Sequence, residues 1–344
     1  MLTWSDIRAI DAIADPLGVV SVYVDRPDAG SGRLVRAVAL AGELRRLERE
    51  VAGSGSTEAA GALHECLHRI RPTLAGMLDG RSPGRALYAP LSGEEVFQLA
   101  VGLPVGVTAT LEPTAYVRPL VAAFDEGRPA GVVVADGAAV QLFEWRMGRV
   151  EEVGECLVAG VRPGSVRTAV AAVAIAREAE AIAAARGWRR VLVAGDTGLA
   201  HTLAHRSAAE GREVGMVTSL VDGLPPRAIA AVVASDLHDA QRRYEERLAE
   251  RVVTAALSDR TAVLGAGRTL AALGDGAVSH LLFDGERDYR WSGALSGSRG
   301  PAALDPAETL IELALHGDAD ITPLEGRSRT LLTESDGVAA VLRR

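Results

Sequence analysis

Short apolar runs and long amphipathic stretches alternate over the first third of the chain. Residues 18–25, GVVSVYVD, are rich in β-branched residues and predict a strand. Residues 32–51 carry apolar positions three and four residues apart, which predicts a long helix. Its expected buried stripe is Leu34, Ala37, Val38, Ala41, Leu44 and Leu47 or Val51. A second helix that ends by Pro72, and two strands around the turn at Ser92-Gly93, complete a predicted α/β unit.

The middle of the chain begins with three strands. Residues 130–153 contain three apolar runs, broken at Asp136-Gly137 and at Met147-Gly148, and Asp-Gly between such runs is typical of a hairpin. A long helix is expected over 165–186, followed by a buried strand, RRVLVAGD, a further helix and another strand. This order predicts a mixed sheet with helices packed on it.

The last third returns to helices and strands after a charged segment. Residues 236–257 mix Arg and Glu densely, which predicts a solvated helical connector. Helix-turn-strand patterns follow in 269–284 and in 306–324. The whole pattern indicates an α/β protein. Its three predicted domains are 1–127, 128–250 and 251–344.

Composition narrows the possible partners. The chain of 344 residues has a net charge of −8, and all 37 of its basic residues are Arg. An acidic protein is not coated with phosphate-binding cations, although Arg keeps bidentate phosphate recognition available locally. No apolar run is long enough to span a membrane, and the first residues do not resemble a secretory signal. With only two cysteines, these features predict a cytoplasmic protein that does not bind membranes.

One short motif suggests zinc chemistry. His64, Glu65 and His68 match H-E-x-x-H, in which two His on one helix face bind zinc and the Glu is a general base. The surrounding helix is less apolar than the site helices of such proteases, and only Glu94 or Glu95 lies at a plausible distance for a third ligand. We therefore expect an ordinary solvated helix, and a zinc-dependent hydrolase is kept as an alternative.

Two glycine-containing turns offer other sites. Residues 263–284 imitate a dinucleotide fingerprint, but the third Gly is replaced by Leu270, so we predict no cofactor. The segment 157–181 runs from a strand through Arg162, Pro163 and Gly164 to Ser165, a candidate helix N-cap. Free N–H groups at a helix start with arginines beside them suit a phosphate or a nucleic-acid backbone.

Several segments taken in order resemble the archaeal and eukaryotic class-one release factor superfamily, which includes Pelota, the hibernation factor Balon and actinobacterial release-factor-like proteins. The resemblance is densest over 115–344. Its main segments are RPLVAAFDEGRPAGVVVADGAAVQLFEWRMGRVEEV, AIAAARGWRRVLVAGD, AGRTLAALGDGAVSHLLFD, ETLIELALHGDADITPL and LLTESDGVAAVLRR. It implies an α/β N-terminal domain, an RNase H-like middle domain and an α/β-sandwich C-terminal domain that usually ends in a short helix.

The resemblance also implies a site. In release factors a middle-domain loop carries Gly-Gly-Gln, and the Gln positions the water that attacks the ester of peptidyl-tRNA. Here Gly164 and Ser165 match the small residues, and Val166 occupies the place of the Gln. Val166 cannot hydrogen-bond a water molecule, which puts ester hydrolysis in doubt. The candidate RNA-contacting residues are Arg162, Gly164, Ser165, Val166 and Arg167.

These features predict a ribosome-binding translation factor that contacts rRNA or tRNA in or near the A site. Rescue or hibernation without peptide release is the expected role, and a peptidyl-tRNA hydrolase is the first alternative. No catalytic residue and no cofactor are assigned. A translational GTPase is a further candidate partner.

Overall fold

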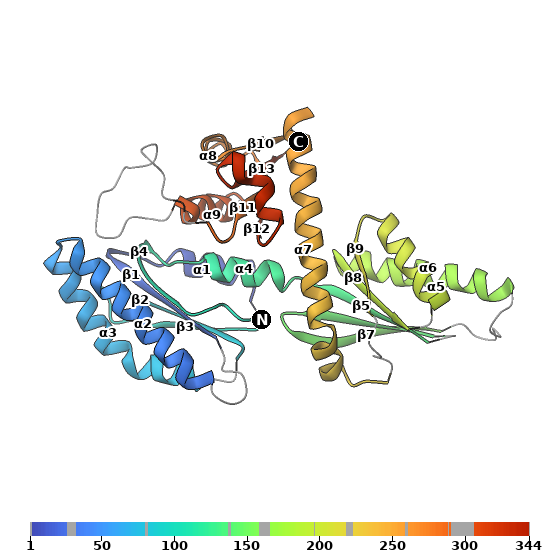
Figure 1. The fold of residues 1–344 in the computed structure, drawn as a ribbon, viewed down its shortest axis with the longest axis horizontal. Coiled ribbons are helices and arrows are strands. Elements are labelled where there is room, and N and C mark those ends of the chain that lie inside the picture. The colour runs from blue at the N-terminus through green and yellow to red at the C-terminus, as the bar shows by residue number, and fades with distance from the viewer. Residues whose placement is uncertain are drawn as a thin grey trace. The chain divides into compact units, whose positions relative to one another are not determined.

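The computed structural model describes most of the chain. The described ranges are 2–25, 32–79, 82–136, 139–157, 166–195, 197–217, 223–258, 261–287, 289 and 306–343. They form three sheets with helices beside them, which confirms the α/β class (Figure 1). The chain divides into two compact units, one of residues 1–125, 249–325 and 329–344, and one of residues 126–248 and 326–328.

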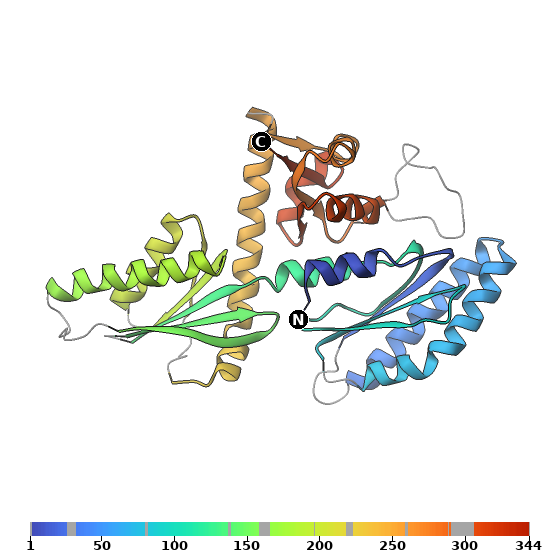
Figure 2. The same cartoon turned by 180° about the vertical axis from the view of Figure 1, so that it is seen from behind.

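The first unit begins with a four-stranded sheet in the order β3-β2-β1-β4. The strands are β1 (Ala14–Asp25), β2 (Gly84–Pro90), β3 (Phe97–Val101) and β4 (Thr108–Thr114). The helices α2 (Gly32–Gly53) and α3 (Thr57–Leu78) lie together on one face of this sheet (Figures 1 and 2). Val20, Val22 and Val24 of β1 pack against them, with Leu63 and Ile70 of α3 in the same core.

The buried face of α2 differs from the predicted stripe. Leu40, Leu47 and Val51 are buried, but Leu34 is 74% exposed and Val38 is 61% exposed. The apolar spacing therefore predicted the helix correctly. It was wrong about which residues of the first turns are buried. The core reaches only the part of α2 that begins at Leu40.

The prediction that Pro72 ends the second helix was also wrong. α3 continues through Pro72 to Leu78. Proline removes one backbone hydrogen bond within a helix, a penalty of about 3 kcal/mol. Leu74 and Met77 lie beyond Pro72 and are buried in the core, and burial of two such side chains offsets a penalty of that size.

The C-terminal segments form a second sheet of the same unit, in the order β10-β13-β11-β12. Its elements are β10 (Ala262–Leu264), α8 (Ala266–Gly274), β11 (Val278–Asp284), α9 (Pro306–His316), β12 (Asp320–Leu324), the 3₁₀ helix η1 (Ser328–Ser335) and β13 (Val338–Leu342). The expected final helix is instead the strand β13. It is held between β10 and β11 by antiparallel pairing, and Val338, Ala339 and Ala340 are fully buried.

Polar contacts tie the two sheets of the first unit together. The backbone N–H groups of Val117 and Arg118, at the start of α4 (Arg118–Glu126), donate to the carboxylate of Glu308 in α9, at 2.9 and 3.2 Å. The guanidinium of Arg118 donates to the carbonyl groups of Asp284 and Gly285 at the end of β11. The N-terminal helix α1 (Trp4–Asp11) also reaches α9, because Arg8 donates to the Leu315 carbonyl at 3.0 Å.

The second unit is built on a five-stranded mixed sheet in the order β7-β6-β5-β8-β9. Its strands are β5 (Ala130–Asp136), β6 (Ala139–Arg146), β7 (Arg149–Leu157), β8 (Arg190–Gly195) and β9 (Glu213–Met216). The helices α5 (Val166–Ala185) and α6 (Thr197–Ala209) pack beside one another on one face, as Figure 2 shows. Ile175, Leu203 and Val193 lie in the core between them and the sheet.

The charged helix α7 (Pro226–Ser258) is longer than predicted and is not a solvated connector. Ile229, Val233 and Leu237 are buried along its first part, and Gln241 and Glu245 are buried polar residues further along. Dense Arg and Glu patterning therefore concealed a helix with one buried face. No helix among the described residues has the length and the apolar character needed to cross a membrane.

Candidate functional site

The predicted RNA-contacting loop joins β7 to α5. β7 ends at Leu157 and α5 begins at Val166. Arg162, Gly164 and Ser165 lie outside the described residues. Val166 and Arg167 are the first two residues of α5, where only the backbone is described. Their role as an RNA contact therefore stays a prediction, but the elements that flank them are defined.

Those elements place the loop at one particular edge of the sheet. β6 pairs antiparallel with both β5 and β7, so β5 and β7 run in the same direction, and β8 and β9 continue the sheet in parallel with β5. The carboxyl ends of four strands therefore share one edge, called here the carboxyl edge. In open α/β sheets, ligands bind beyond the carboxyl ends of strands, where the strand order reverses. The reversal lies between β5 and β8.

Gly195 marks the reversal point. It ends β8 with φ of 105°, and a Cβ added there would lie 1.9 Å from the carbonyl oxygen of Ala135 in β5. Only glycine combines this backbone conformation with so close an approach of two strands. The sequence RRVLVAGD predicted the strand, but not that its glycine would abut the neighbouring strand.

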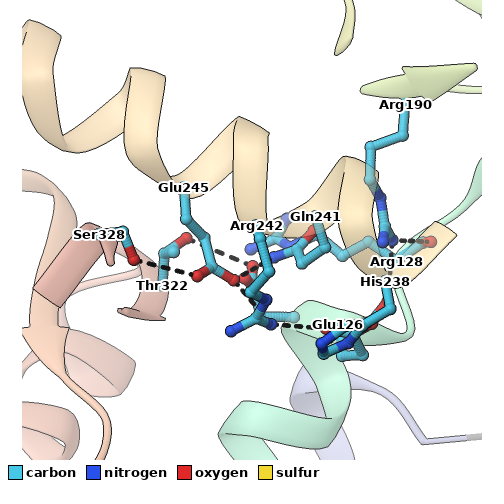
Figure 3. Close-up of polar contacts among 10 residues, drawn as sticks. Glu126, Arg128, Arg190, His238, Gln241, Arg242, Glu245, Thr322 and Ser328 are labelled. Carbon is cyan, nitrogen blue, oxygen red and sulfur yellow. Dashed lines mark hydrogen bonds and ion pairs between the residues drawn. The ribbon is translucent and has the colours of Figure 1, made fainter. Parts of the chain in front are cut away.

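The opposite edge of the same sheet, called here the amino edge, holds a buried ionic network that sequence reasoning missed. The guanidinium of Arg190 is buried and donates to the carbonyl groups of Glu126 at 2.8 Å and Arg128 at 3.0 Å (Figure 3). It also lies 5.7 Å from the ring centre of Trp145. The signal in the sequence was an arginine at the start of an otherwise apolar strand.

The network continues along α7. Arg242 pairs with the carboxylate of Glu126 at 2.8 Å and with that of Glu245 at 3.0 Å (Figure 3). Gln241 and Ser328 also donate to the Glu245 carboxylate, at 3.0 and 3.3 Å. Each carboxylate of the network is paired with a guanidinium or accepts from a donor, and the Arg190 guanidinium donates to carbonyl groups, which is what burial of ionic groups requires. We assign this network to stability rather than to ligand binding.

The HECLH residues lie on the exposed face of α3. His64, Glu65 and His68 all point away from the core, while Cys66 between them is buried. Within the described ranges, no group of three or more His, Cys, Asp or Glu side chains is placed to hold a metal ion. A complete zinc site needs at least three protein ligands.

The glycine segment that imitates a dinucleotide fingerprint forms the start of α8. Gly265 adopts a left-handed conformation with φ of 87° between β10 and α8. β13 lies between β10 and β11 and is antiparallel to both, whereas a dinucleotide fold places the two parallel strands side by side. The segment is a tight turn of the C-terminal sheet.

A buried hydroxyl near a histidine has a structural role as well. Thr322 lies 3.0 Å from Nε2 of His280 and donates to the carboxylate of Asp125 at 3.3 Å. In a hydrolytic triad the histidine stands between the carboxylate and the hydroxyl, whereas here the hydroxyl stands between the other two. Thr322 is also fully buried, so no substrate can reach it.

The region that leads into the loop matches a known protein family. Residues 116–163 match the model of "Bacterial archaeo-eukaryotic release factor family 10". This match confirms the resemblance to the release factor superfamily over these residues. The matched segment covers β5, β6 and β7 and ends just before Gly164. No curated protein matches the chain.

Solved structures of release factor relatives are also similar over much of the chain. A chain described as ribosome-bound archaeal Pelota with ABCE1 is 13% identical, with 99% of this chain and 94% of that chain covered and a TM-score of 0.44. S. cerevisiae Dom34 is 13% identical, with 75% and 79% covered and a TM-score of 0.42. The archaeal termination factor aRF1 is 17% identical, with 100% and 99% covered and a TM-score of 0.26.

Proposed function

We propose that this chain is a translation factor that binds the ribosome in or near the A site and acts in rescue or hibernation. Arg162, Gly164, Ser165, Val166 and Arg167 are its RNA contact. The protein acts in the cytoplasm, and a translational GTPase is a candidate partner in delivering it to the ribosome.

The family-model match carries this proposal. It ends at residue 163, directly before the small-residue pair Gly164-Ser165, and thus covers the strands that lead into the loop. The position of β7 supports it further, because its carboxyl end opens onto the edge where α/β sheets bind ligands. Free N–H groups at the start of the 20-residue helix α5, with Arg162 and Arg167 beside them, suit RNA phosphates.

Ribosome binding tests the proposal. The variant Arg162→Glu/Arg167→Glu replaces two cations with anions, and we expect it to lose co-sedimentation with ribosomes at low salt. The wild type should bind ribosomes less tightly as the salt concentration rises. Ribosome binding by Arg162→Gln/Arg167→Gln should depend less steeply on salt. Arg177→Glu/Arg268→Glu is a charge-matched control, since both side chains are exposed and lie outside the loop. Equal co-sedimentation of the loop variant and the control would contradict the proposal.

The absence of peptide release is a separate part of the proposal. The loop sequence contains no Gln, and the aliphatic side chain of Val166 cannot orient water. We expect the wild type to release no peptide from stalled peptidyl-tRNA in vitro. Val166→Gln restores the amide, and release by that variant alone would show that this side chain is what the loop lacks. Release by the wild type would instead support the alternative of a peptidyl-tRNA hydrolase.

A further inference from the structure

The outer side of β9 is an open strand edge. On its inner side, the N–H of Glu213 donates to the Arg189 carbonyl at 2.9 Å and the N–H of Val217 donates to the Val193 carbonyl at 2.8 Å. Alternate residues of a strand direct their backbone polar groups to opposite sides. Val214 and Met216 therefore direct theirs away from β8. In the part of the chain that the structure describes, no strand pairs with this outer side.

The residues that face outward along this edge, Val214 and Met216, are neither lysine nor proline. Natural edge strands carry lysine, proline, a bulge or an inward charge, which discourages the addition of another strand. Residues 214–216 are Val, Gly and Met, and the Met216 side chain is 43% exposed. The one charged residue of β9, Glu213, is buried and tied to Arg243 and Arg247 of α7. Its inward charge is the one such protection in this strand, and it is neutralised by these two arginines.

A pocket runs beside the open edge. Its volume is ≈ 260 Å³, and it is lined by Val214, Gly215, Met216, Asp236, Asp239 and Arg243. Gly215 leaves no room for a side chain at this point, because a Cβ there would lie 2.6 Å from a methyl group of Leu192. One wall of the pocket is thus the backbone of β9, and the other is the α7 face that carries the two aspartates.

The charge of the pocket defines its occupant. Asp236 and Asp239 are one helical turn apart on α7 and both line the pocket. Arg243 is already bound to Glu213 at 2.8 Å, so the uncompensated charge of the lining is negative. An added strand supplies backbone groups for Val214 and Met216, and a cationic side chain on that strand supplies the counter-charge.

We propose that the outer edge of β9 binds an extended segment of a basic partner protein as an added strand, with a Lys or Arg side chain seated between Asp236 and Asp239. This docking surface is formed by β9 and α7 and does not depend on the proposed ribosome contact. The net charge of −8 also favours a basic partner over an acidic one.

A labelled peptide tests this surface directly. The probe is a fluorescein-labelled extended peptide, Thr-Val-Arg-Val-Thr-Val, and its companion carries Glu in place of Arg. Fluorescence anisotropy with the full chain at low salt should show at least about ten-fold tighter binding of the Arg peptide. Met216→Pro should abolish the binding, because proline removes an N–H that faces outward and leaves the ladder to β8 intact.

A second variant keeps the test decisive if Met216→Pro does not fold. Asp236→Asn/Asp239→Asn changes only side chains of α7 that line the pocket, and it should reduce binding of the Arg peptide to the level of the Glu peptide. Equal binding of the two peptides by the wild type would overturn the proposal. Binding of the Arg peptide that is unchanged in Asp236→Asn/Asp239→Asn would overturn it as well.

Discussion

The two edges of the five-stranded sheet carry charged residues in opposite ways. At the amino edge, Arg190, Arg242 and Glu245 are all engaged by partners within the second unit. At the carboxyl edge, the chain segments that follow β5, β7, β8 and β9 begin side by side, and the candidate loop is one of them. The arginines of the amino edge therefore stabilise the fold, and the carboxyl edge is where the predicted RNA-contacting loop begins.

Composition alone does not distinguish these two kinds of arginine. All 37 basic residues are Arg, so every cationic site in the chain has the same chemical appearance in the sequence. A guanidinium can serve equally in a buried hydrogen-bonded pair and in a phosphate contact. The structure assigns Arg190 to the first role, and the second role stays a prediction for Arg162 and Arg167.

The largest expected effect comes from removing the buried arginine of the amino edge. Arg190→Ala removes a fully buried guanidinium and leaves the carbonyl groups of Glu126 and Arg128 without that donor. We expect the free energy of unfolding to fall by about 3–5 kcal/mol, as measured by urea denaturation. Arg186→Ala is the matched control, since its ion pair with Glu144 is 3.6 Å long and half exposed, and it should lose less than about 0.5 kcal/mol. Similar losses in the two variants would remove the distinction between the edges.

The next effect concerns the carboxyl edge. Gly195→Ala places a methyl group against the Ala135 carbonyl oxygen, in a backbone conformation that L-residues avoid. Strain and overpacking together should lower the free energy of unfolding by about 2–4 kcal/mol. Gly187→Ala separates the two causes, because Gly187 also has a positive φ, of 67°, but has no atom within 4 Å of the added Cβ.

The two glycine variants should therefore differ by the overpacking contribution alone. We expect Gly187→Ala to lose about 1 kcal/mol, measured in the same denaturation experiment. If Gly195→Ala were as mild as Gly187→Ala, β5 and β8 could move apart at that edge, and the close approach at the reversal point would not be a fixed feature of the sheet.

Much of the fold could be predicted because its strands and helices follow local rules. The runs 18–25 and 130–153 became strands, and the helix that follows the candidate loop begins at Val166. The failures involve tertiary contacts that no local pattern encodes. α3 passes through Pro72 because Leu74 and Met77 have a core to enter, and the end of the chain is a strand because β10 and β11 both pair with it.

The site was less predictable than the fold. The sequence predicts an RNA contact around Gly164, which stays a prediction, and it does not show at which edge of the sheet β7 ends, since that depends on the directions of five strands. It gave no sign that Glu245 of a highly charged helix is buried. Burial of a polar residue depends on the partner that faces it, and such partners here come from residues far apart in sequence, such as Ser328.

A smaller expected effect comes from a buried carboxylate outside the five-stranded sheet, that of Asp11. Asp11 ends α1, where the helix dipole disfavours negative charge, and burial together with nearby Glu312 raises its pKa to about 6, against the opposing effect of His316. Because this pKa is above the unfolded value of 3.8, the ionised form is disfavoured in the fold. Asp11 therefore lowers stability as the pH rises from about 4 through about 6.

The variant Asp11→Asn should remove this pH dependence. At pH 7.5 we expect the free energy of unfolding of the variant to exceed that of the wild type by about 1 kcal/mol, after allowance for solvent screening of a partly hydrated group. At pH 4 we expect no difference. Thermal unfolding at the two pH values measures the difference. Glu250→Gln, at an exposed position of α7, is the control and should change stability equally at both. A gain for Asp11→Asn that did not depend on pH would mean that desolvation of the carboxylate is not its cause.

The smallest expected effect concerns the exposed HECLH residues of α3. His64, Glu65 and His68 have the spacing of a zinc motif, but they lie on the solvent face of α3, and the described residues supply no third ligand. The chemistry of a motif depends on what the fold brings to face it, as the two sheet edges also show. We expect elemental analysis of the purified protein to find far less than one equivalent of zinc, and His64→Ala/His68→Ala to shift the unfolding free energy by less than about 0.5 kcal/mol. Stoichiometric zinc that is lost in this variant would instead establish the hydrolase alternative as the better reading of the N-terminal helices.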